Sequence, residues 1–183
     1  MSHDYQDLIK LFEQCFYQPY NTRLVKGGEE PFYLPSNEHC GYHQIIFAHG
    51  YYASALHEVA HWCLAGEARR LLEDFGYWYL PDGRNAEQQK RFEQVEIKPQ
   101  AIEWAFCVAS GKPFTVSADN LNGAEADTVN FKRAVYQQVK VYLQQGFPTR
   151  AQKFIDALAA FYQVTIPLTL EQFMDEKESY ESI

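Results

Sequence analysis

The sequence predicts an α+β fold, with a small mixed sheet and several helices in a single domain that spans residues 1–183. A chain of 183 residues has the length of one ordinary domain and can bury a sizeable core. Hydrophobic residues make up 46% of it, including 13 tyrosines and 13 phenylalanines, which is more than a disordered chain would carry. Helical and strand-like spacings of apolar residues both occur along the chain, and no repeat, low-complexity block or linker divides it.

The first part of the chain contains the predicted strands. Apolar residues at three- and four-residue spacing predict an amphipathic helix over residues 4–17. Pro19 is expected to end this helix, because proline lacks the N–H group that a helix interior needs. A short strand closed by Gly27-Gly28 is expected at residues 22–25, and a second at 42–48, where β-branched and aromatic residues gather. Residues 31–35 are expected to be extended.

The rest of the chain is predicted to be mainly helical. Neither proline nor glycine interrupts residues 51–65, which predicts a helix there, with a continuation to residue 76 as an alternative. Pro99 is expected to start a new helix, because proline is favoured at the first helical position. The remaining predictions are helices at 86–95, 100–110, 128–145 and 150–162, a short helix near 169–174, and a frayed acidic tail at 175–183.

The motif with the most chemical content is H-E-x-x-H, formed by His57, Glu58 and His61. Histidines four residues apart lie on one face of a helix, so both imidazoles can bind one metal ion. Glu58 follows the first histidine, where its carboxylate can reach a water or substrate atom beside the metal. A strand directly before such a helix is common in zincin-like proteins, in which the edge of the strand borders the metal cleft.

Three glutamates are candidates for a third metal ligand. Glu67 has the spacing used by metzincins, but it reaches the metal only if Gly66 ends the helix. Glu96 stands just before the expected helix start at Pro99, where its carboxylate can point back at a neighbouring segment. Glu103 lies inside that helix, as the downstream glutamate does in gluzincins. From their positions in the sequence we rank Glu96 first, Glu103 second and Glu67 third as the third ligand. For each of them the alternative is a carboxylate on the protein surface.

The motif alone leaves the metal and the reaction open. Two histidines and one carboxylate can hold Fe(II) for oxygen activation, or zinc for hydrolysis. Glu58 would be the general base of a zinc peptidase, or an orienting or proton-handling group in an oxygenase. A zinc hydrolase, either a peptidase or a metal-dependent endoribonuclease, is therefore the alternative to an iron oxygenase.

An aromatic segment near the motif supplies candidate substrate-binding residues. Tyr77 and Tyr79 can form the wall of a pocket for a long amine side chain, with core or rim positions as the alternative. Asp82 lies in the turn that follows and can contact a substrate, although a solvated turn residue is the simpler interpretation.

Charge and composition exclude several classes of protein. The formal net charge of −8 argues against a nucleic-acid binder and suits a basic partner. No apolar run approaches the ~18–20 residues of a membrane span, and residues 1–4 lack the basic and apolar segments of a signal peptide. The four cysteines are scattered, which indicates reduced thiols. We therefore expect a cytoplasmic protein that contacts neither nucleic acid nor membrane.

Beyond the motif, the chain resembles the elongation factor P hydroxylase family over most of its length. The matching blocks are residues 57–62 with 65–70, 74–79 with 81–84, 92–101 with 103–104, and 113–121. The central blocks are specific rather than generic.

This resemblance implies a bacterial monooxygenase that hydroxylates the lysine of elongation factor P after a β-lysyl group has been added to it. It also implies a 2-His-1-carboxylate site with non-heme Fe(II), and a fold similar to a zincin-like ribosome-maturation endonuclease. His57 and His61 match the two histidines of the family, and the block from Glu96 to Ala101 is where the carboxylate is expected. The β-lysylated lysine is a cationic arm, which agrees with the acidic charge of this chain.

Overall fold

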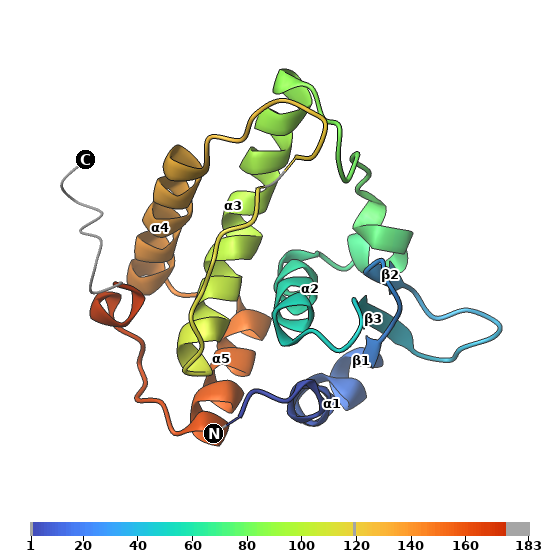
Figure 1. Cartoon of the computed structure of the whole chain (residues 1–183). Helices are drawn as coiled ribbons and strands as arrows, with labels where there is room; N and C mark the ends of the chain where they lie inside the picture. Colours follow the sequence, from blue (N-terminus) through green and yellow to red (C-terminus); the bar gives the residue numbers. More distant parts are fainter. Residues whose placement is uncertain (1, 119, 175–183) are drawn as a thin grey trace.

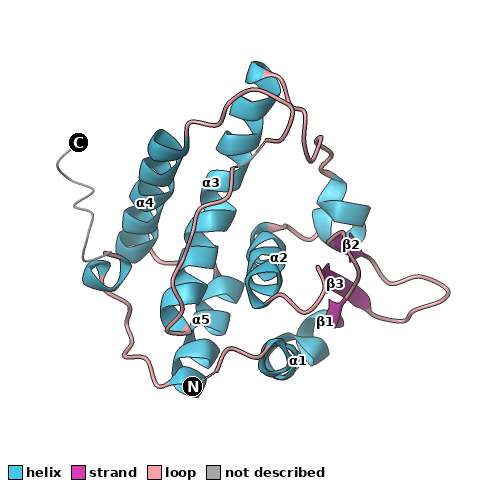
Figure 2. Ribbon diagram, viewed as in Figure 1, coloured by secondary structure: helices cyan, strands magenta, loops and turns pink. Residues whose placement is uncertain are grey.

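A computed structural model describes residues 2–118 and 120–174, and in it a small sheet lies at one side of a group of helices (Figure 1). The strands are β1 (Thr22–Lys26), β2 (Phe32–Leu34) and β3 (His43–Phe47). The helices are α1 (Tyr5–Tyr20), α2 (Tyr52–Leu64), α3 (Ala86–Ala109), α4 (Thr128–Gln145) and α5 (Thr149–Tyr162). Three short 3-10 helices are η1 (Arg69–Leu71), η2 (Glu73–Gly76) and η3 (Leu170–Phe173). The predicted α+β class is confirmed (Figure 2).

β3 is the central strand of the sheet, which has the order β1-β3-β2. It pairs in parallel with β1 and antiparallel with β2, so the sheet is mixed, as predicted. Ile45 of β3 lies opposite Leu24 and Tyr33 on its two neighbours, and all three side chains are buried. β3 then leads through a short turn into α2, which places the start of that helix directly beside the sheet.

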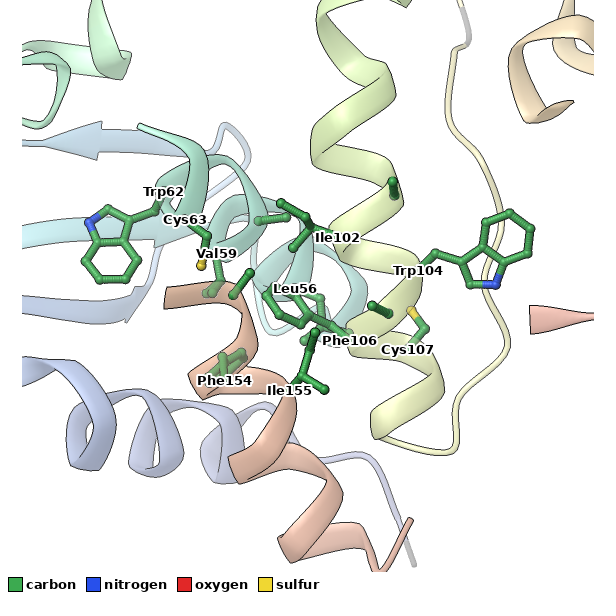
Figure 3. Close-up of a cluster of buried hydrophobic side chains, with 14 of the residues drawn as sticks. Leu56, Val59, Trp62, Cys63, Ile102, Trp104, Phe106, Cys107, Phe154 and Ile155 are labelled. Carbon is green, nitrogen blue, oxygen red and sulfur yellow. The ribbon is translucent and has the colours of Figure 1, made fainter. Parts of the chain in front are cut away.

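α2 lies between the sheet and α3 (Figure 1). Leu56 and Val59 of α2 and Ile102 and Phe106 of α3 belong to one cluster of fully buried side chains (Figure 3). Burial of such a side chain contributes about 1.5–3 kcal/mol, so this interface fixes the two helices relative to each other. α4 and α5 pack against other parts of α3, and α1 packs against β1 and α5.

The predicted end of α1 was wrong. The helix continues through Pro19 to Tyr20 and ends at Asn21, whose φ of 48° is left-handed. Pro19 stands in the last turn, so the N–H that it lacks removes a hydrogen bond only at the end of the helix. Asparagine adopts the left-handed conformation more readily than most residues, which explains why the helix ends there.

The prediction of a helix start at Pro99 was also wrong. Pro99 lies inside one continuous helix, α3, so the helices expected at 86–95 and 100–110 are a single element. An interior proline destabilises a helix by about 3 kcal/mol. All residues in the range 100–107 are buried, and their packing outweighs this local cost.

α2 ends earlier than its longer predicted alternative. Ala65 leaves helical geometry with a ψ of 121°, and the chain then forms η1 and η2. Within η2 the backbone is left-handed at Asp74, with φ 46°, and at Phe75, with φ 60°. The short helix expected near residues 169–174 is the 3-10 helix η3.

Within residues 2–118 and 120–174, no helix is long and apolar enough to cross a membrane. The acidic tail predicted at 175–183 lies outside the described residues. The assignment of the whole chain to one domain stays a prediction.

Candidate metal centre

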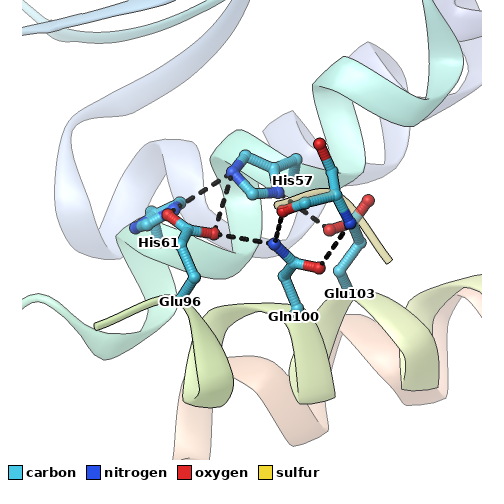
Figure 4. A network of polar contacts seen from close by, with 6 residues as sticks. His57, His61, Glu96, Gln100 and Glu103 are labelled. Atoms are coloured by element: carbon cyan, nitrogen blue, oxygen red, sulfur yellow. Dashed lines mark hydrogen bonds and ion pairs between the residues drawn. The ribbon is translucent and has the colours of Figure 1, made fainter. Parts of the chain in front are cut away.

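His57 and His61 lie on one face of α2, one turn apart, and point toward α3 (Figure 4). The end of this helix is held in place by Arg150 of α5. The Arg150 guanidinium lies 4.5 Å from the centre of the buried Trp62 ring and donates hydrogen bonds to the backbone oxygens of Trp62 (2.7 Å) and Ala65 (2.6 Å). Carbonyls at the end of a helix have no partner within it, so these contacts stabilise α2 and fix the histidines.

The two histidines and Glu96 of α3 form a compact group of possible metal ligands. The Nε2 atoms of His57 and His61 are 3.1 Å apart. Glu96 Oε1 lies 3.0 Å from His61 Nε2, and Glu96 Oε2 lies 3.6 Å from His57 Nε2. One ligand atom from each residue lies within 4.8 Å of the other two. Two elements far apart in sequence thus bring three metal-ligating side chains to one point.

The chemistry of this group fits a metal ion. The Glu96 side chain is only 1% exposed, and its Oε1 accepts no hydrogen bond of good geometry despite its short distance to His61. A buried carboxylate oxygen without a hydrogen bond is costly, and a bound cation would satisfy it. Two imidazole nitrogens and one carboxylate suit either Fe(II) or zinc. The group can therefore hold a metal, and the donor atoms alone do not select which one.

Other side chains of α3 and its neighbouring loop orient these ligands (Figure 4). His57 Nδ1 donates to Glu103 Oε2 at 2.8 Å, which directs Nε2 toward His61 and Glu96. Gln100 Nε2 donates to Glu96 Oε2 at 3.1 Å. The Gln100 amide is itself fixed by two hydrogen bonds with the backbone of Ser117, at 2.6 and 3.0 Å. Both the imidazole ring and the carboxylate therefore have a defined orientation.

The three candidate third ligands lie in different places. Glu96 belongs to the group with the two histidines. Glu103 contacts the other nitrogen of His57, Nδ1, and so faces away from the point where the Nε2 atoms meet. Glu67 follows the end of α2, is exposed, and is not part of the group.

The charges of the group are strongly coupled. Burial alone would lower the pKa of His57, but the nearby carboxylates of Glu103 and Glu96 raise it to about 10. Burial alone would raise the pKa of Glu96, but His61 and His57 lower it to about 2. Glu96 is therefore ionised at neutral pH, whereas His57 is protonated. A metal ion that binds His57 must displace a proton from the His57 ring.

A cavity of about 310 Å³ opens beside His61 and Glu58. Tyr77 and Tyr79 line its wall, so two of the expected substrate-binding residues lie next to the metal group. Burial raises the pKa of the Glu58 carboxyl above its ordinary value, although His57 and His61 act in the opposite direction. A carboxyl of this kind can exchange a proton nearer to neutral pH than an exposed glutamate can.

Asp82, the third expected substrate-binding residue, does not line this cavity. Its Oδ1 accepts a hydrogen bond from the backbone N–H of Leu121 at 2.9 Å.

Sequence reasoning missed Asp74 and Glu30, which do line the cavity, because they come from separate segments that only the fold brings together. It also missed Gln100. The spacing of four residues from Glu96 would have indicated Gln100 if α3 had been predicted as one helix.

Comparisons with known proteins match this chain to one family. A family model described as "Elongation factor P hydroxylase" matches residues 11–173. A relative from Haemophilus influenzae, named "Elongation factor P lysine hydroxylase", is 56% identical over 173 residues, which cover 94% of this chain and 97% of the relative. The aligned region therefore covers nearly all of this chain and nearly all of the relative. The chain belongs to the elongation factor P hydroxylase family.

Proposed function

We propose that this protein hydroxylates the β-lysylated lysine of elongation factor P, with Fe(II) held by His57, His61 and Glu96 and with O2 as the oxidant. The family and the named relative support the reaction and the protein substrate. The observation that supports the metal-dependent part is the grouping of the two imidazole Nε2 atoms with the buried Glu96 carboxylate, whose Oε1 accepts no hydrogen bond of good geometry. This group lies beside a cavity that can receive a side chain.

A bound Fe(II) ion would supply the activation of O2 for the oxidation of a C–H bond. The chain supplies the rest of the site. Glu103 keeps the His57 ring in the orientation that presents Nε2, and Gln100 holds the Glu96 carboxylate. Glu58 lines the cavity next to His61 and serves as the group that accepts and returns a proton near the reacting atoms. The cavity holds the substrate side chain close to His61.

The second candidate is a zinc hydrolase, either a peptidase or an endoribonuclease. The position of Glu58 in the cavity beside His61 favours it, because a general base in that place is what a zinc hydrolase needs. The zincin-like fold expected from the sequence also stays a prediction. The match to a hydroxylase family favours the first candidate.

We further propose that the protein acts in the cytoplasm, where translation factors are found, without nucleic acid or membrane as a partner. The excess of 24 acidic over 16 basic residues suits a cationic substrate better than a polyanion.

The direct test is mass spectrometry of β-lysylated elongation factor P after incubation with the protein, Fe(II), a reductant and air. We expect the substrate to gain one oxygen atom, and to gain none with the His61→Ala variant or under nitrogen. If no oxygen is gained across a range of reductants, or if zinc supports full turnover under nitrogen, the proposal is wrong.

A further inference from the structure

The walls of the cavity beside the metal group come from several separate parts of the chain. Glu30 comes from the loop before β2, Glu58 and His61 come from α2, and Asp74 comes from η2. Val95, the residue before Glu96 on α3, closes another side. The cavity therefore reaches one residue of the candidate metal centre, His61.

Among the residues that the structure describes, the lining of this cavity carries acidic side chains and no basic ones other than His61. Three of its residues, Glu30, Glu58 and Asp74, are carboxylates, and the described lining contains no lysine or arginine. The pKa of Tyr79 is raised by burial and then by the carboxylates of Glu96, Glu58 and Asp74. These carboxylates therefore act on one shared space, and a cation placed there would be attracted by all of them.

Aromatic rings complete the lining. Tyr77, Trp78 and Tyr79 follow one another along the cavity, and Trp78 is 83% exposed. The Arg69 guanidinium lies 4.1 Å from the centre of the Tyr77 ring and donates to the Phe75 oxygen at 3.0 Å, which holds this segment in place. Carboxylates combined with aromatic faces are the surroundings that bind an ammonium group in proteins.

The backbone holds Asp74 in a fixed and unfavourable conformation. Asp74, Phe75 and Gly76 are all left-handed, with φ of 46°, 60° and 75°. Asp74 Oδ1 accepts a hydrogen bond from Tyr33 N–H at 2.9 Å, and the Phe75 ring stacks on the Tyr33 ring at 4.2 Å. The other oxygen, Oδ2, accepts no hydrogen bond from the described residues, so it is free to receive one from a ligand.

We infer that Asp74 and Glu30 bind the ammonium group of the substrate's lysine-derived side chain and set the specificity for a cationic arm. This inference rests on the proposed function. Glu58 remains beside His61 for the reaction itself, so recognition of charge and proton transfer are divided between different carboxylates of one cavity.

The test compares Asp74→Asn and Glu30→Gln with matched controls. The controls Glu73→Gln and Glu29→Gln remove the same charge from exposed neighbours that do not line the cavity. Asparagine keeps the oxygen that accepts from Tyr33 N–H and tolerates a positive φ.

Binding of β-lysylated elongation factor P is measured by calorimetry under nitrogen, so that the readout does not depend on turnover. We expect Asp74→Asn to weaken binding about tenfold through the loss of one charge-assisted contact, the exposed Glu30→Gln to weaken it about three- to fivefold, and each control to change it less than about twofold. Melting temperatures of all variants establish that they are folded. Glu30 is exposed, so its variant keeps the test valid if Asp74→Asn is unstable.

Cavity variants that bind as tightly as their controls would overturn the inference, even if the wild-type protein adds oxygen to its substrate. A different result would separate the two proposals. If the wild-type protein binds β-lysylated elongation factor P but adds no oxygen to it, while both cavity variants lose affinity, the recognition of the amine is supported and the proposed oxidation is wrong.

Discussion

At the scale of single residues, one face of α3 carries the side chain that completes the metal group with the two histidines of α2, and the side chains that orient this group. Glu96 contributes a carboxylate to the group, Gln100 fixes that carboxylate, and Glu103 fixes the ring of His57. The two histidines could be predicted from their spacing alone, since a helix places residues four apart on one face. Glu96 was ranked first on the expectation of a helix start after it, whereas the structure places it within a continuous helix.

Substitution of the three glutamates one at a time separates their roles. Glu96→Gln removes the anionic donor, so we expect the affinity for a divalent metal to fall by more than 100-fold. Glu103→Gln leaves the donors in place but weakens the orientation of His57, and such contacts are typically worth about 10–100-fold. Glu67→Gln should leave affinity unchanged. Titration of each metal-free variant measures these affinities, and a greater loss in Glu103→Gln than in Glu96→Gln would contradict the ligand assignment.

At the scale of elements, the start of α3 is tied to the segment before it by a buried arginine. The Arg84 side chain donates to Gln89 Oε1, to Leu80 O and to Pro81 O, each at 2.7 Å. Its guanidinium also lies 3.8 Å from the centre of the Phe92 ring. These contacts join the end of the aromatic segment to α3, which carries Glu96. Composition predicted only a turn here, because a buried charge cannot be read from local sequence.

Replacement of Arg84 by methionine should destabilise the protein by about 3 kcal/mol, since it removes a buried guanidinium that donates to the buried Gln89 side chain and to two backbone oxygens. The matched control is Arg91→Met, because the Arg91 side chain is 76% exposed and pairs with the equally exposed Glu87. That pair is a surface ion pair of little value to stability. Urea unfolding measures both variants. Equal midpoints for the two would show that the Arg84 contacts do not hold α3 in place.

The wrong prediction at Pro99 has a physical cause that local sequence does not show. Local rules treat proline as a helix boundary, but they take no account of the buried surface on either side of it. Pro99 lies in a helix whose next eight residues are all buried, so tertiary packing decides the outcome. The strands were easier to predict, because β1 and β3 are short runs that contain β-branched residues and are followed by turn residues.

At the scale of the whole molecule, the fold brings the H-E-x-x-H helix, a distant carboxylate and an acidic aromatic cavity to one place. The class of fold and the family could be inferred from composition and from matching blocks. The contribution of Glu30 and Asp74 could not, since they are 44 residues apart and meet only because β2 packs against η2.

A metal that binds only the folded protein should stabilise the whole domain. At a free concentration 100 times the dissociation constant the gain is about 2.7 kcal/mol, or a melting temperature higher by roughly 5–10 °C for a chain of this length. We expect this shift on addition of Fe(II) under nitrogen, and its loss in His57→Ala. A shift of the same size in that variant would place the metal elsewhere.

The central claim is that His57, His61 and Glu96 hold the iron on which hydroxylation depends. The most direct measurement is the metal content of protein purified without oxygen, taken together with oxygen gain by β-lysylated elongation factor P from the same samples. We expect about one iron per chain and oxygen gain in the wild-type protein, and the loss of both in His57→Ala and Glu96→Gln. Oxygen gain in either variant without bound iron, or zinc as the metal that supports wild-type turnover, would contradict it.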